Sequence, residues 1–211
     1  WIDGDVLNAA GQAFHDGTRL DLGAWTPDKA SNLFAGHTVF TLVLELSDAE
    51  LLAVAGPDRR IGVWAVTRLA TDAGGWHQIN RAGLPMIHPL FAQHDEHLGE
   101  HLNLGGPAND VGDHTTTVTD LVAGTVAAYG TAADPESYGA AVASRLLPNM
   151  LPYTVGTPAV FGFAAWNGRS LTDNTPDVMF SLAANTPISI GLTKDSVTYK
   201  PGTAYPYLGR P

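Results

Sequence analysis

Residues 37–46 carry the sequence HTVFTLVLEL, and this stretch decides the fold that we predict for the chain. Its apolar side chains alternate along the sequence, and alternation with a period of two is the pattern of a β-strand. Both faces of the predicted strand are largely apolar, which indicates that other parts of a protein cover each of them. The two sets of side chains are Phe40, Leu42, Leu44 and Leu46 on one face and Val39, Thr41, Val43 and Glu45 on the other.

Two further strands are predicted after this one. A Gly-Pro-Asp turn at 56–58 leads to a strand over 61–69, and a Gly-Gly turn at 74–75 leads to a short strand over 76–80. The three strands together predict an antiparallel β-meander. Because three strands are too few to form an independent sheet that is covered on both faces, we expect this meander to be part of a larger sheet.

The remaining residues carry helical patterns, with apolar residues at helical spacing and capping residues near the ends. We expect Asp5 to cap a first helix that ends at Gly17, and Asp113 to cap a helix over 115–129. Other helices are predicted over 94–103, from Asp134 to the residue before Pro148, and from Thr175 to near Asn185. The sequence therefore predicts a single α+β domain over residues 1–211, in which the meander packs against several helices.

Composition restricts the classes of function. The 21 acidic residues outnumber the 11 basic ones, giving a net charge of −10. Because nucleic-acid binding needs a positive surface, this balance argues against nucleic acid and against anionic membranes as partners. No apolar run reaches the roughly 18 residues of a membrane helix. The absence of cysteine excludes disulfides and thiolate sites, and it fits a cytoplasmic protein slightly better than a secreted one.

Histidine residues form the first candidate site. His94, His97 and His101 share one face of the predicted helix, and the last two have the spacing that two metal ligands on a helix need. His88 lies shortly upstream and is a fourth candidate ligand. Such a face could hold a divalent metal ion such as zinc, nickel or copper. The alternative is a solvated, titratable helix face, since the region is strongly polar and lacks a His-Glu-x-x-His motif.

The same region supports a hypothesis of catalysis. Asp95 or Glu96 could act as a general base beside a metal ion held by the histidines. The chain has no Gly-x-Ser-x-Gly nucleophile motif and no glycine-rich phosphate loop. If the protein is an enzyme, we therefore expect a metal-assisted reaction on a small molecule, with its site in residues 88–101.

Arg169, Asp173 and Asp177 form a second constellation. An arginine and two aspartates in a turn can make bidentate, charge-assisted hydrogen bonds. They can also tie a loop to the start of the last helix, where Asp177 would meet the positive end of the helix dipole, and we favour this structural role. A calcium site that includes Asn174 is the alternative, although the spacing lacks the regular ligand positions of an EF-hand loop.

Several blocks of sequence resemble the bacterial domain-of-unknown-function family 4331. These blocks are residues 34–39 (FAGHTV) running into 42–46 (LVLEL), 61–65 (IGVWA), 79–85 (INRAGLP) and 167–173 (NGRSLTD), and the ending at 205–208 (YPYL) is also similar. The resemblance implies no established reaction. The positions that it shares with the family are Asn80, Arg81, Pro85, Asn167, Arg169, Asp173 and Asp177.

The resemblance also implies a missing part. Family members look roughly twice as long, and their first half contributes further strands and a segment rich in histidine and aspartate. Since this chain matches only the second half and begins with Trp1 instead of Met, we expect the C-terminal chain of a cleaved precursor. Unintended proteolysis or a deliberate truncation are the alternatives. The expected partner is the N-terminal half, with a small ligand or metal ion held between the two halves.

Overall fold

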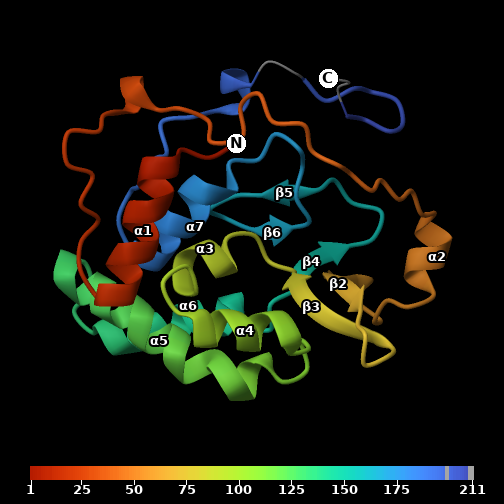
Figure 1. Ribbon diagram of the computed structural model, residues 1–211, viewed down its shortest axis with the longest axis horizontal. Coiled ribbons are helices and arrows are strands. Elements are labelled where there is room, and N and C mark those ends of the chain that lie inside the picture. Colours follow the sequence, from red (N-terminus) through yellow and green to blue (C-terminus); the bar gives the residue numbers. More distant parts are fainter. Residues whose placement is uncertain (198–199, 209–211) are drawn as a thin grey trace.

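The computed structural model describes residues 1–197 and 200–208 of this chain, and it is an α+β structure, as the sequence predicts (Figure 1). The α-helices of the described residues are α1 (Gly4–Asp16), α2 (Asp48–Leu52), α3 (Ile87–Phe91), α4 (Glu96–Leu104), α5 (Asp110–Tyr129), α6 (Pro135–Leu146) and α7 (Thr175–Ala184). The strands are β1 (Arg60–Val63), β2 (Ala65–Ala70), β3 (Trp76–Ala82), β4 (Leu151–Thr154), β5 (Val160–Phe161) and β6 (Trp166–Asn167). No helix within these ranges is long and apolar enough to cross a membrane.

Local capping fixes most of the helix ends. Asp3, rather than Asp5, caps α1, because its side chain accepts hydrogen bonds from the backbone N–H groups of Asp5 and Val6 at 3.0 Å each. Gly17 ends α1 in the left-handed conformation, as predicted. The expectation that Asp113 caps a helix is wrong, because α5 begins earlier, at Asp110.

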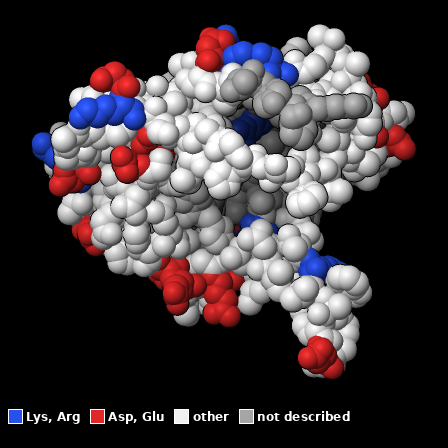
Figure 2. All heavy atoms as spheres, turned by 45° about the horizontal axis from the view of Figure 1, so that its top comes forward, with Lys and Arg blue, Asp and Glu red and all other residues white. Residues whose placement is uncertain are grey.

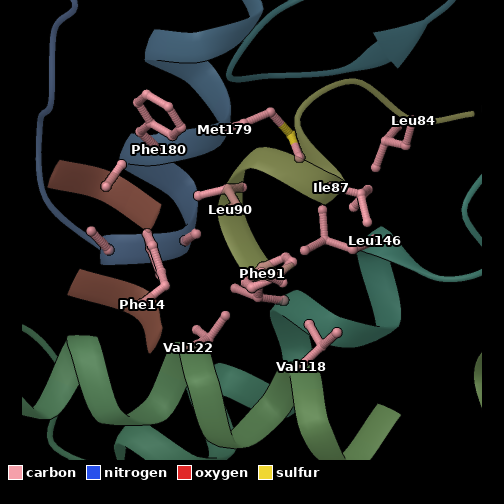
Figure 3. Packing of buried hydrophobic residues seen from close by; sticks show 14 of the residues in the cluster. Phe14, Leu84, Ile87, Leu90, Phe91, Val118, Val122, Leu146, Met179 and Phe180 are labelled. Atoms are coloured by element: carbon pink, nitrogen blue, oxygen red, sulfur yellow. The ribbon is translucent and has the colours of Figure 1, made fainter. Parts of the chain in front are cut away.

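The hydrophobic core lies among the helices. Figure 3 shows side chains of α1, α3, α5, α6 and α7 directed into one cluster, including Phe14, Leu90, Phe91, Val118, Val122, Leu146, Met179 and Phe180. The rings of Phe14 and Phe91 meet edge to face, with centroids 5.7 Å apart. Burial of each large side chain contributes about 1.5–3 kcal/mol to folding, so this cluster is the main source of stability.

The strands form three separate pairs instead of one meander. β2 pairs antiparallel with β3, which confirms the predicted hairpin, whereas β1 pairs with β4 and β5 with β6. The predicted strand over 61–69 therefore divides at Trp64, because its two parts bond to different neighbours. Within the described ranges no sheet has more than two strands.

The prediction of a strand over 37–46 is wrong for this structure. The segment crosses from the N-terminal region to α2 without regular secondary structure (Figure 1). No backbone group of residues 38–46 bonds to another backbone group of the described chain, because no other strand runs beside it. Among the described residues, the hydrogen bonds to this segment come from two tyrosine hydroxyls: Tyr205 donates to the Val43 carbonyl and Tyr207 to the Glu45 carboxylate, each at 3.0 Å.

Candidate functional site

A buried ion pair joins the hairpin to the helices. The guanidinium of Arg81, near the end of β3, donates to both carboxylate oxygens of Asp110, at 2.9 and 2.7 Å. Its Nε donates to the carbonyl of Leu102, and Asp110 also accepts the backbone N–H of Asn149 at 2.7 Å. The two charged side chains are 0% and 1% exposed. Because each charge is desolvated and needs the other, Arg81 is a cross-link between elements that are distant in the sequence.

Asn149 extends this network. Its Oδ1 accepts the backbone N–H of Leu84 at 2.7 Å. The backbone of Gly83 lies against it so closely that a Cβ at position 83 would be 2.1 Å from the Asn149 carbonyl oxygen. Only glycine fits there, so the end of β3 and the segment after α6 are held in one fixed contact.

The histidine-rich segment is divided between three surroundings. α4 begins at Glu96, and Asp95 is its N-cap, accepting the backbone N–H of Leu98 at 2.9 Å. His94 therefore lies before the helix, and its ring is 6.1 Å from that of His15. His97 and His101 lie together on the exposed face of α4, with ring centroids 4.3 Å apart.

Metal ligands are thus only partly assembled in this chain. Among the described residues no three His, Asp or Glu side chains lie close enough to hold a metal ion together. His97 and His101 offer two neighbouring imidazoles, and Glu96 is exposed beside them. Asp95 is engaged in capping. The metal site stays a prediction, and it would need at least one further ligand from outside this cluster.

His88, the fourth candidate, lies elsewhere, in α3. Its Nε2 is buried and has no hydrogen-bond partner among the described residues. Burial lowers the pKa of His88, the side chain of Asn103 acts in the opposite direction, and the charge of Arg81 lowers the pKa further. The imidazole is therefore neutral at pH 7 and can donate from one ring nitrogen.

A cavity of about 360 Å³ brings four of the sequence candidates together. Asn80, Arg81, His88 and Arg169 all line it, although Arg169 lies far from the other three in the sequence. The remaining lining residues are Ala82, Gly83, Leu84, Pro85, Met86, Ile87, Pro89, Asn149 and Leu151. In Figure 2 one face of the molecule is hollowed near its middle, and Lys or Arg atoms lie in the hollow.

Arg169 is the available charge of this cavity. Its guanidinium makes no hydrogen bond or ion pair with the part of the chain that the structure describes. The residue is exposed, yet protein atoms crowd around it, so desolvation lowers the pKa of the guanidinium while Asp173 raises it. An arginine stays protonated under all ordinary conditions, so the cavity contains a cation that has no bonded counter-ion among residues 1–197 and 200–208.

The other residues of the second constellation are engaged in the fold. Asn167 accepts the backbone N–H of Thr154 at 2.7 Å. Asp173 accepts those of Phe161 and Ser170, at 2.9 and 2.7 Å. Asp177, in the first turn of α7, accepts the N–H of Ile190 at 2.8 Å. Burial raises the pKa of Asp177, and its hydrogen bonds from Ile190, Ser189 and Asn174 act in the opposite direction.

Four larger cavities contain fewer candidates. One of about 710 Å³ lies beside α7 and includes Asp177, Phe163 and Tyr138 in its wall. Another, of about 540 Å³, lies beside α1 and is lined by Arg19 and Trp25 among others. The other two, of about 390 and 430 Å³, contain none of the candidates. None of the four brings together residues from both constellations, so the cavity of Arg169 is the best candidate site.

A scan against protein-family models and searches of curated proteins and of solved structures find no match to this chain. The fold and the cavity define an α+β protein with a buried Arg–Asp cross-link and a basic, partly apolar pocket. The likeness to the domain-of-unknown-function family remains a resemblance on the quoted residues.

Proposed function

We propose that this chain is a binding subunit, which pairs with the N-terminal half of the same precursor and holds a small ligand between the two halves. The observation that carries the proposal is the unpaired segment 38–46. It has the sequence pattern of a two-faced strand but no backbone partner within the described residues.

The segment leaves large apolar side chains in water. Phe40 is 100% exposed, Leu42 is 101% exposed and Leu44 is 79% exposed. Each such side chain would contribute about 1.5–3 kcal/mol if it were buried. An unpaired extended backbone is also a template on which another chain can add a strand. Both properties support an interface along 38–46.

The hairpin β2–β3 is a second exposed apolar surface that the partner could cover. Trp76 is 70% exposed, Leu69 54% and Ile79 46%, so β2 and β3 are open to solvent over most of their length. An interface of ordinary size uses about 20–30 residues on each side, which is more than one exposed strand supplies. The hairpin and the segment 38–46 together approach that size.

The N-terminal half is a better occupant than a second copy of this chain. The resemblance implies that the first half of the precursor contributes further strands, which is what an unpaired strand lacks. Two copies would each bring a net charge of −10 to the contact, and like charges oppose association. A second copy is therefore the competing outcome of the test.

Co-expression of the two halves tests the proposal. The tagged chain should co-purify with the N-terminal half, and native mass spectrometry should give the summed mass of the two. The double variant Phe40→Asp/Leu42→Asp should abolish this association. Val111→Asp, which changes a 54% exposed apolar residue on α5, is the matched control and should leave it intact. A chain that stays monomeric beside the N-terminal half, or that forms only homodimers, contradicts the proposal.

The alternative function is a metal-assisted enzyme. It is favoured by the adjacent His97 and His101 rings, and a partner chain could add the missing ligands. A metal ion should then be retained through purification of the two-chain complex and be lost in His97→Ala/His101→Ala. A complex that carries no metal, or a metal content that survives the double variant, contradicts this alternative.

A further inference from the structure

We propose that the cavity lined by Arg169, His88 and Asn149 binds a small monocarboxylic acid with an apolar body. This proposal rests on the ligand-binding part of the proposed function and not on the identity of the partner chain. Nothing in the sequence singles out Asn149, whose role depends on contacts across the fold.

The first support is the unpaired guanidinium. Two other arginines are engaged, with Arg81 on Asp110 and Arg145 over the ring of Trp166, 4.2 Å from its centroid. Arg169 has no such contact within the described residues, and it faces a cavity. A guanidinium presents two parallel donors that match the two oxygens of a carboxylate.

The second support is a neutral donor in the same wall. Asn149 is 2% exposed, and while its Oδ1 accepts Leu84, its Nδ2 donates to no acceptor in the described chain. The buried Nε2 of His88 is likewise unbonded there. The Nδ2 of Asn149 is a donor that an acceptor in the cavity would satisfy, whereas protein atoms enclose the Nε2 of His88.

The third support is the charge of the lining. No Asp or Glu is among the described residues that line the cavity, although the chain as a whole is strongly acidic. Arg81 also belongs to the wall, but Asp110 neutralises its charge. Arg169 is therefore the one charge of the described lining without an ion pair, although Asp173 acts on it from outside the lining, and a single charge suits a monoanion better than a phosphate dianion.

Size and polarity define the rest of the ligand. A volume of about 360 Å³ lies in the range of small-molecule sites, which runs from about 300 to 1,000 Å³. One part of the wall is apolar and consists of Leu84, Pro85, Met86, Ile87 and Leu151. A ligand with a carboxylate at Arg169 and a short hydrocarbon body against this apolar wall fits both the charged and the apolar part of the cavity.

Isothermal titration of the purified chain with hexanoate is the test, with 1-hexanol and inorganic phosphate as comparison ligands. Hexanoate should bind, and the uncharged alcohol and the phosphate should bind much more weakly. Arg169→Gln should weaken hexanoate binding about 10- to 100-fold, since a hydrogen bond to a charged group has that effect. Arg169→Lys should give an intermediate affinity, because it keeps the charge without the two-donor fork.

Arg19→Gln is the matched control, since it removes one positive charge from a residue outside the cavity, whose contacts are the backbone carbonyls of Ala128 and Tyr129 and the ring of Tyr129. It should leave hexanoate binding unchanged. Thermal denaturation should give the same Tm for Arg169→Gln as for the unaltered chain, because Arg169 has no bonded partner among the described residues. The proposal is overturned if the chain binds hexanoate and 1-hexanol with equal affinity, or if Arg169→Gln binds hexanoate as tightly as the unaltered chain does.

The same titration on the two-chain complex separates the possible sources of a carboxylate. If hexanoate binds the two-chain complex with the same affinity as the single chain, the site belongs to a small molecule. If the N-terminal half abolishes hexanoate binding, and Arg169→Gln weakens the association of the halves, a partner carboxylate occupies the site and the proposal is wrong. Hexanoate binding without association of the halves would leave the carboxylate site standing and remove the two-chain function. Absence of hexanoate binding in both preparations also overturns the proposal.

Discussion

Individual side chains in this protein depend on partners that are distant in the sequence. Arg81 meets Asp110 across 29 residues, and Asn149 meets Leu84 across 65. The sequence predicts that Arg81 and Arg169 matter, through the family resemblance, but it gives no sign of Asp110 or Asn149. Asp110 looks like an ordinary residue near the start of a helix, and its role exists only once β3 lies beside it. The candidate cavity could therefore be predicted only in part.

Loss of one member of the buried pair should be costly. Asp110→Ala leaves the Arg81 charge buried and uncompensated, so the free energy of unfolding should fall by about 3–5 kcal/mol. Urea denaturation measures the change. Asp195→Ala is the control, since its pairs with Lys194 and Lys200 are exposed and its removal should have no measurable effect. Equal stability of Asp110→Ala and the unaltered chain would show that Arg81 finds another partner or reaches solvent.

Buried histidine should make stability depend on pH. Burial lowers the pKa of His114. The charges of Asp110 and Asp113 act to raise this pKa, and those of Arg81 and His101 lower it further. Burial also lowers the pKa of His88. The unfolded chain therefore binds more protons below pH 6.5, the ordinary value. Stability should be complete above pH 6.5 and should fall as the pH drops through the lower folded values.

Urea denaturation at pH 7, 6 and 5 measures this dependence. His114→Gln should reduce the loss of stability between pH 7 and pH 5, because one of the responsible groups no longer titrates. His77→Gln, which removes an exposed histidine, is the matched control. A pH dependence unchanged by His114→Gln would show that the imidazole can be protonated in place, with Asp110 and Asp113 compensating for burial.

Among the helices and strands, the sequence predicts several helix ends, but it does not predict which strands distant in the chain pair. The ends of α1 and α6 follow from Gly17 and Asp134, which act on neighbouring residues. The pairing of β1 with β4 joins Arg60 to Thr154, and no local pattern specifies it. The alternation over 37–46 predicts a strand, but the described residues contain no neighbouring strand with which it could pair, so the segment has no regular structure.

The exposed segment should contribute little to the stability of the isolated chain. Leu42→Ser removes a fully exposed apolar side chain, so the Tm should not change and aggregation, followed by light scattering, should decrease. Leu90→Ala, in the core, should instead destabilise the chain by about 2–5 kcal/mol. A loss of stability in Leu42→Ser comparable to that of Leu90→Ala would mean that residues 37–46 pack against the body of the protein.

The whole molecule combines a well-packed helical region with a poorly covered strand region (Figures 1 and 3). Stability is therefore expected to be uneven along the chain. Amide hydrogen exchange should be slowest in α5 and α6, while residues 38–46 should exchange almost as fast as an unfolded peptide. Addition of the N-terminal half should slow exchange in 38–46. Slow exchange there in the isolated chain would contradict the unpaired state.

Gly83 affects both the buried ion pair and the cavity, because its backbone lies against Asn149. Its neighbours in β3 include Arg81, and its contact with the Asn149 carbonyl sets how near the strand comes to that segment. In a saturation library every side chain at this position, alanine included, would act as a wedge between the two segments. The wedge would lengthen the Arg81–Asp110 bonds and open the wall of the carboxylate cavity together. A single missing methyl group thus couples stability to ligand binding, and selection for either property alone would preserve the same glycine.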